Sequence, residues 1–206
     1  WAREVGKMAG INLPVQPMEH HYLITETIPE IKERINEPRL PIGTDFEGNI
    51  YFRQEAQGML LGTYEFKSTP WQVKQTPMDF GHELLEPKLD NIQDRLEIGF
   101  KRIPALEKAG IKNIINGPFT FGPDGSPLIG PVPGKKNYWV AVGVMAGFCQ
   151  AGGVGKCIAE WIIDGEPSLD VWAMDVARFG DYASPDYGTI KSSENYERRF
   201  IMTFPN

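Results

Sequence analysis

Residues 138–165 read YWVAVGVMAGFCQAGGVGKCIAEWIIDG, and this stretch decides the fold class. The apolar run 138–142 predicts a fully buried strand. The segment 143–155 is rich in glycine and predicts a loop, and a helix is expected over roughly residues 152–164, ending at Gly165. Backbone N–H groups at such a helix start can approach a ligand, and the helix dipole favours negative charge there. Tight packing of the helix against a sheet is the alternative reason for so many small residues.

The rest of the chain predicts an antiparallel sheet with flanking helices. The expected strands, joined in part by a hairpin turn at 56–58, cover residues 15–27, 49–55, 59–66 and 111–121. The expected helices cover residues 1–9, 29–36, 81–109 with breaks near Pro87 and Pro104, and 185–199. Together with the strand–glycine loop–helix stretch, this order predicts an α+β fold, or mixed α/β, with two structural regions.

The composition is that of a globular protein and excludes two classes of partner. Of the 206 residues, 41% are hydrophobic and 23% charged, and the formal net charge is −6. This acidic balance excludes the basic footprint of a nucleic-acid-binding protein and a patch for an anionic membrane surface. The longest uncharged stretch, residues 137–155, contains too many glycines for a membrane span. Cys149 and Cys157 are the only cysteines, which favours a reducing compartment.

Polar and aromatic residues on two predicted strands are candidate functional groups. On the first strand, His20 faces one side and His21 the other, because side chains alternate along a strand. The two histidines therefore point apart, and no metal site is expected. On the second strand, Tyr51 and Arg53 share one face. The pattern alone is more often structural than catalytic.

Separated motifs of the chain, taken together, resemble the FAD-dependent amine oxidoreductases of the dimethylglycine and sarcosine dehydrogenase type. The motifs, in chain order, are WAREVGKM (1–8), PMEHHY (17–22), YFRQ (51–54), NGP (116–118), PD (123–124), PLIG (127–130) and AGGVGK (151–156). The resemblance covers essentially the whole chain, and it is specific because the motifs agree in order and spacing. It implies that the chain, which starts at Trp1 and ends at Asn206, is a fragment without the family's N-terminal dinucleotide-binding fold and C-terminal folate-binding domain.

The resemblance also implies a division into domains. Residues 1–12 would be a remnant of the FAD-binding domain, and residues 13–115 the antiparallel-sheet substrate domain. Residues 116–166, with the strand–glycine loop–helix, would be the C-terminal part of the FAD-binding domain. Residues 167–206 would begin a central linker domain.

The same resemblance implies the site residues. His20 and Tyr51 would be catalytic, and Arg53 would bind the substrate carboxylate. The residues expected to contact FAD are Trp1 and the segment before the helix, namely Val144, Met145, Ala146, Gly147, Phe148 and Cys149. Tetrahydrofolate would bind only through the missing C-terminal domain.

The leading hypothesis is therefore a fragment of a flavoenzyme that oxidises a small N-methylated amino acid, of the dimethylglycine or sarcosine type, by hydride transfer to flavin. Three alternatives stay open: an inactive structural fragment, a related flavoenzyme acting on another amino or hydroxy acid, and a non-enzymatic binding module. We expect a cytoplasmic protein, or one of the mitochondrial matrix in a eukaryote. The isolated chain is expected to bind FAD weakly and to self-associate as a homo-oligomer through an exposed apolar face.

Overall fold

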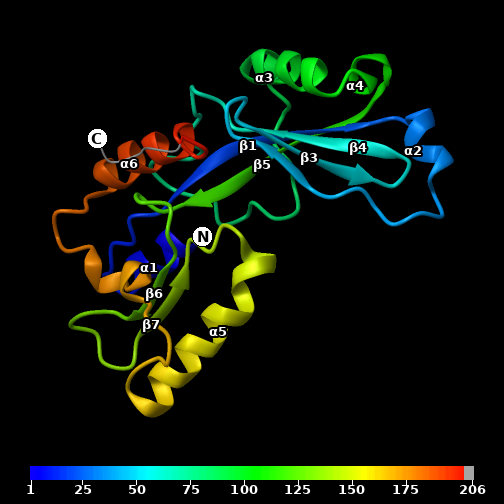
Figure 1. Ribbon diagram of the computed structural model, residues 1–206. Helices are drawn as coiled ribbons and strands as arrows, with labels where there is room; N and C mark the ends of the chain where they lie inside the picture. Colours follow the sequence, from blue (N-terminus) through cyan, green and yellow to red (C-terminus); the bar gives the residue numbers. More distant parts are fainter. Residues whose placement is uncertain (202–206) are drawn as a thin grey trace, which may run out of the picture. The chain divides into compact units, whose positions relative to one another are not determined.

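The structure is a computed structural model that describes residues 1–201, and the chain divides into two compact units (Figure 1). Unit 1 comprises Trp1–Met18, Pro70–Gly81 and Phe119–Asn195, and unit 2 comprises Glu19–Thr69, His82–Pro118 and residues 196–201. No helix within residues 1–201 is both long enough and apolar enough to cross a membrane.

Unit 2 is built around a sheet with the strand order β2-β3-β4-β1-β5. The strands are β1 (Gln16–Thr25), β2 (Gly43–Asp45), β3 (Ile50–Glu55), β4 (Gly58–Thr63) and β5 (Ile111–Phe121). The pairs β1–β4, β2–β3 and β3–β4 are antiparallel, and β3 and β4 form the hairpin predicted from the sequence. The first residues of β1 and the last residues of β5 belong to unit 1.

Helices cover one face of this sheet and bury the core of unit 2 (Figure 1). They are α3 (Leu89–Arg102) and α4 (Ala105–Lys108), while the short α2 (Pro29–Glu33) follows β1. The strand register places Leu61 between Leu23 and Phe52, and these side chains pack with Ile92 and Leu96 of α3. Each fully buried aliphatic side chain contributes about 1.5–3 kcal/mol of transfer free energy to this packing.

Unit 1 combines a two-stranded antiparallel ladder with helices. The ladder pairs β6 (Leu128–Pro131) with β7 (Trp139–Val142). The helical segments are α1 (Ala2–Met8), α5 (Gly147–Asp164), the 3-10 turns η1 (Trp172–Met174) and η2 (Val176–Arg178), and α6 (Pro185–Glu197), which ends in unit 2. Leu13 and Val15 pack with Leu128, Val140 and Val176 in its core.

The structure corrects the sequence prediction for α5. This helix begins at Gly147, not near residue 152, so residues 147–149 are helical and do not precede the helix. Glycine in a helix interior costs roughly 1 kcal/mol relative to alanine, which is why the segment reads as a loop. Tertiary packing outweighs that cost here, because Val154 and Cys157 are buried against Ile129. Gly165 ends the helix with a φ of 90°, as predicted.

Smaller differences also have local causes. The strand predicted as fully buried is only partly so, since Val140 is buried and Ala141 is exposed on a ladder of two strands. Its partner β6 was not predicted, because four residues between turns carry little periodic signal. Residues 81–88 are not helical, in keeping with the bias against helical backbone before Pro87. Helix α2 stops at Glu33, short of the predicted residue 36. Residues 202–206 of the predicted linker domain lie outside the described residues.

Candidate functional site

The predicted catalytic residues His20 and Tyr51 are hydrogen-bonded to each other in unit 2. The Tyr51 hydroxyl lies 2.9 Å from Nε2 of His20, and the Tyr196 hydroxyl lies 3.0 Å from Nδ1 of the same ring. The ring of Tyr64 packs beside them, with its centroid 4.7 Å from that of His20. Strand β1 supplies His20, β3 supplies Tyr51 and α6 supplies Tyr196. The imidazole therefore has a phenol at each of its two nitrogens.

Strand register explains how Tyr51 reaches His20. Tyr51 is paired with Gly62 of β4, and Gly62 is paired in turn with Tyr22 of β1. Alternation places these positions, and His20 two residues before Tyr22, on the sheet face opposite the core. A Cβ atom built on Gly62 would fall 1.9 Å from Cζ of Tyr51, so the phenol ring lies directly over this glycine. The absent side chain leaves room for Tyr51 to extend across β4 towards β1.

A buried carboxylate lies behind this pair. Glu65 is only 5% exposed, and it accepts a short hydrogen bond from the Tyr196 hydroxyl at Oε2 and one of 3.0 Å from Thr63 at Oε1. Nδ1 of His21 lies 3.3 Å from Oε1 of Glu65. The Nε2 atom of His21 accepts a hydrogen bond of 3.3 Å from the backbone N–H of Lys88. The hydroxyls of Tyr196 and Thr63 thus supply one donor to each oxygen of this buried carboxyl group.

Burial controls the protonation of the cluster. Desolvation lowers the pKa of His20 to about 4, and the charge of Glu65 opposes this shift only in part. Desolvation likewise raises the pKa of Tyr51, and it raises that of Tyr196 together with the charge of Glu65. At neutral pH the imidazole is therefore uncharged and both phenols keep their protons. A neutral imidazole of this kind can accept a proton.

The predicted substrate-binding residue Arg53 is paired within the chain. Its guanidinium lies 2.8 Å from Glu55, two residues along β3, and its side chain is 42% exposed. Alternation puts Arg53 on the same face as Tyr51. A half-exposed ion pair contributes little to stability, so this cation can exchange partners at small cost.

The residues predicted to contact FAD lie in unit 1. The Trp1 side chain is 46% exposed, and its indole N–H donates a hydrogen bond of 2.9 Å to the Pro77 carbonyl. Val144 packs against the buried side chains of Ile129, Val154 and Cys157. Phe148 and Cys149 are exposed. Met145 is partly buried, and its backbone N–H bonds the Gly143 carbonyl at 2.9 Å.

The N-terminus of α5 has the features of an anion-binding helix end. Ala146 occupies the N-cap position without a side-chain hydrogen bond, and the first turn carries no acidic residue. The first N–H groups of a helix have no partner within it, and the helix dipole is positive there. Gly143 has a φ of +67°, which allows the chain to turn from β7 into this segment.

The glycines of α5 are not explained by packing within this chain. A Cβ atom added at any of four of them, Gly147, Gly152, Gly153 and Gly155, would meet nothing within 4 Å among the described residues. The alternative of tight helix–sheet packing therefore has no support within residues 1–201. The open surface around Gly147 fits the approach of a planar ligand to the helix N-terminus.

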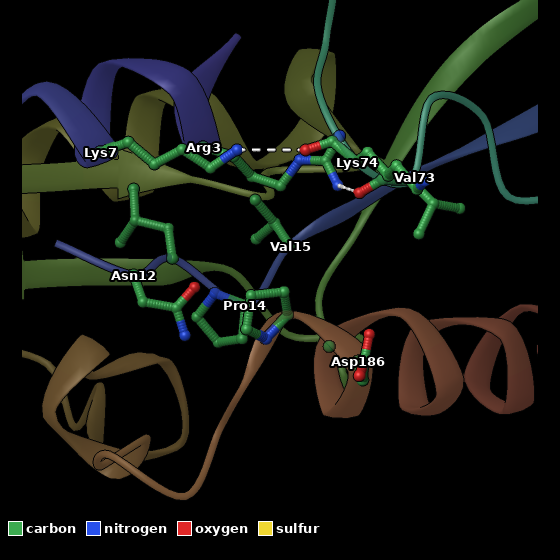
Figure 2. Close-up of a pocket in the computed structure, with 11 residues that line it drawn as sticks. Arg3, Lys7, Asn12, Pro14, Val15, Val73, Lys74 and Asp186 are labelled. Carbon is green, nitrogen blue, oxygen red and sulfur yellow. Dashed lines mark hydrogen bonds between the residues drawn. The ribbon is translucent and has the colours of Figure 1, made fainter.

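A separate cavity of about 240 Å³ opens in unit 1 beside α1 (Figure 2). Arg3 donates to the Val73 carbonyl at 3.2 Å, and Lys7 donates to the Lys74 carbonyl at 3.3 Å, as the dashed lines show. Lys7 also pairs with Glu4. These cations hold the loop after residue 70 onto α1, and none of the predicted site residues lines this cavity. Among residues 1–201, no group of three or more His, Cys, Asp or Glu side chains could hold a metal ion.

Four residues of the cluster were missed at the level of sequence: Gly62, Tyr64, Glu65 and Tyr196. A glycine within an apolar strand signals a close approach of another group, so Gly62 could have been suspected. Tyr196 has no local signal, because it lies 176 positions from His20 along the chain. Glu65 follows β4 and is recognised only by its burial.

The chain has relatives among known proteins. Residues 1–161 match the model of the FAD dependent oxidoreductase family, and residues 164–206 match that of the FAD dependent oxidoreductase central domain. The whole chain is 44% identical to mitochondrial dimethylglycine dehydrogenase of Mus musculus, covering 24% of that protein. It is 32% identical to mitochondrial sarcosine dehydrogenase of Mus musculus, covering 22% of it.

A solved structure shows the same fold. L-proline dehydrogenase from P. horikoshii superposes with a TM-score of 0.68 at 27% identity, over 87% of this chain and 44% of that one. The chain therefore belongs to the family of FAD-dependent oxidoreductases, and it is related to the dimethylglycine and sarcosine dehydrogenases.

Proposed function

We propose that the protein containing this chain binds FAD and oxidises a small N-methylated amino acid of the dimethylglycine or sarcosine type. The chain spans about 24% of the length of the dimethylglycine dehydrogenase it matches, so the activity is proposed for the whole protein. The observation that carries the proposal is the bond of 2.9 Å between Tyr51 and a neutral His20. It supplies a proton acceptor of the kind that amine oxidation needs.

Residues at the start of α5 would hold the flavin. The backbone N–H groups of Gly147 and Phe148 are the first donors of the helix, and Ala146 does not cap them with its side chain. FAD, when bound, accepts the hydride and gains negative charge, which a helix N-terminus stabilises. We assign the flanking contacts to Trp1 and to the side chains of Val144, Met145 and Cys149.

His20 and Tyr51 would remove the proton from the substrate ammonium. An amine can lose hydride from its methyl group only when its nitrogen lone pair is free. The Tyr51 hydroxyl can pass its proton to Nε2 of His20 while it takes one from the ammonium nitrogen. The low pKa of His20 keeps the lone pair of Nε2 available at neutral pH, and it also makes the imidazole a weak base.

Arg53 would bind the substrate carboxylate. Its guanidinium is half-exposed on the face that carries Tyr51, and it pairs with Glu55. A guanidinium forms strong, paired hydrogen bonds with a carboxylate, so the substrate can replace Glu55 as its partner.

The proposal is tested by the rate of flavin reduction with sarcosine and with dimethylglycine in the FAD-loaded protein. We expect His20→Asn to lower this rate by about 10²–10⁴-fold, the range of general acid–base catalysis, with the flavin content unchanged. His82→Asn is the matched control, because His82 is an exposed histidine of the same unit. An unchanged rate in His20→Asn, or turnover of neither amine by the wild-type protein, would reject the proposal.

Two further assignments accompany this proposal. We propose that residues 167–206 begin a linker domain, and the match of residues 164–206 to the central-domain model supports this part of the division. Both related dehydrogenases from Mus musculus are named as mitochondrial, which supports a mitochondrial location for a eukaryotic parent.

A further inference from the structure

The hydrogen bonds around His20 have a defined direction. Both oxygens of Glu65 accept hydrogen bonds, from Tyr196 at one and from Thr63 at the other. The Tyr196 hydroxyl is the donor to Oε2 of Glu65, so its single proton points to Glu65 and not to His20. The oxygen of Tyr196 then offers a lone pair to Nδ1 of His20, which lies 3.0 Å away.

The direction of this chain determines the tautomer of the imidazole. A neutral imidazole carries one proton, and the nitrogen that carries it must face an acceptor. Nδ1 of His20 faces the Tyr196 lone pair, so Nδ1 holds the proton and Nε2 is free to accept from Tyr51. We propose that Glu65 and Tyr196 are positioning residues that hold His20 as its Nδ1–H tautomer, so that Nε2 is the base facing Tyr51.

The surrounding groups agree with this polarity. His21 on β1 accepts the Lys88 N–H at Nε2, and its Nδ1 atom lies 3.3 Å from Oε1 of Glu65. Within residues 1–201, further charged groups that act on the cluster are Arg53 on β3, near Tyr51, and Arg199, which binds Tyr64. Neither of them is an acceptor that could reverse the bonds at His20.

This arrangement has a consequence for proton transfer that rests on the proposed function. When Nε2 takes the proton of Tyr51, the imidazole becomes a cation with N–H groups on both sides. Its Nδ1–H bond to Tyr196 then strengthens, and the charge of Glu65 stabilises the cation through the intervening phenol. Glu65 and Tyr196 thus act through His20 and not on the substrate.

The tautomer is measured by ¹⁵N NMR of the imidazole nitrogens in the FAD-loaded protein, with no substrate present. We expect His20 to be neutral at pH 7, with its proton on Nδ1 and an unprotonated Nε2. In Tyr196→Phe the acceptor for Nδ1–H is lost, so the Nε2–H form is expected to become the major species. A wild-type His20 with its proton on Nε2 overturns the proposal, even if the variant does not fold.

Tyr64→Phe is the matched control for this experiment. It also removes one phenol hydroxyl from the cluster, but that hydroxyl interacts with Arg199. The control is expected to keep the Nδ1–H form, and a tautomer change of equal size in both variants would show that the effect is only one of packing. That result would overturn the role of Tyr196.

The kinetic readout separates this inference from the proposed function. Tyr196→Phe is expected to lower kcat for sarcosine or dimethylglycine about tenfold with little change in KM, which corresponds to loss of one hydrogen bond made to a charged intermediate state. If Tyr196→Phe changes the tautomer of His20 but the wild-type protein turns over neither amine, the proposed function is rejected and the inference stands. If the wild-type protein turns over the amine and Tyr196→Phe keeps both the tautomer of His20 and kcat, the inference is rejected and the proposed function stands.

Discussion

The phenol ring of Tyr51 lies over Gly62, its partner across the β3–β4 hairpin, and leaves no room there for even one methyl group. This contact connects the sheet register to the candidate site. Because Gly62 has no side chain, Tyr51 reaches the Nε2 atom of His20 on the next strand. The position of Tyr51 on β3 therefore depends on the absence of a side chain at Gly62 on β4.

Replacing Gly62 with alanine should displace Tyr51 and break its bond to His20. The added Cβ would be 1.9 Å from the ring, so the phenol must move. Overpacking of this kind costs about 1–3 kcal/mol of unfolding free energy. We expect kcat for the proposed amine substrate to fall at least tenfold, and both quantities are measured by denaturant unfolding and steady-state kinetics.

Gly43→Ala is the matched control for that substitution. In the same sheet, a Cβ at Gly43 would fall 2.2 Å from the ring of Phe52, which packs towards the core and not towards His20. We expect a similar loss of stability with kcat within about twofold of wild type. Equal loss of activity in both variants would mean that general destabilisation is responsible.

The low pKa of His20 should make stability depend on pH. The folded pKa is about 4 against 6.5 for a free histidine, so between these pH values the unfolded chain binds the additional proton. The stability associated with the neutral imidazole is fully present above pH 6.5 and is lost as the pH falls towards 4. The total loss of unfolding free energy is up to about 3 kcal/mol. His20→Gln should remove this component, and the difference between the two unfolding curves measured from pH 7 to 4.5 isolates it. Identical slopes in the two proteins would contradict the prediction.

The uncapped N-terminus of α5 gives a test of the flavin assignment. Ala146→Ser and Ala146→Asp each supply the missing side-chain cap, which should raise the unfolding free energy by about 1 kcal/mol. Only aspartate adds a negative charge where the reduced flavin would be negative. We expect FAD affinity and reduction potential to fall in Ala146→Asp and to stay near wild type in Ala146→Ser, as measured by fluorescence titration and potentiometry. Equal FAD properties in both variants would remove the helix N-terminus from the cofactor site.

Two glycines of the same helix should respond in opposite directions to alanine. Gly155 lies within α5 with open space around its Cα, so Gly155→Ala should stabilise the chain by up to about 1 kcal/mol. Gly165 has a φ of 90°, so Gly165→Ala should destabilise it by about 1 kcal/mol or more. Thermal unfolding of the 206-residue chain distinguishes them. A loss of stability in Gly155→Ala would show that this face of the helix packs against a group outside the described contacts.

Local pattern was sufficient for many elements of the fold. The hairpin of β3 and β4, the bounds of β5 at residues 111–121 and the end of α5 at Gly165 all agree with the sequence prediction. Each depends on the alternation of side chains or on a turn residue within a few positions, so the signal is contained in a short window. The start of α5 was predicted wrongly, because burial of Val154 and Cys157 outweighs the low helix propensity of its glycines.

The sequence by itself determined the family resemblance, the strand pattern and the candidates His20 and Tyr51. Only the tertiary structure joined His20 to Tyr196 across 176 positions, and Tyr196 to Glu65 across 131. Such contacts depend on strand register and on the path of the chain between elements, and neither is contained in local periodicity. Burial, which sets the low pKa of His20, is likewise a property of the assembled cluster, because removal of water requires neighbours that are distant in sequence.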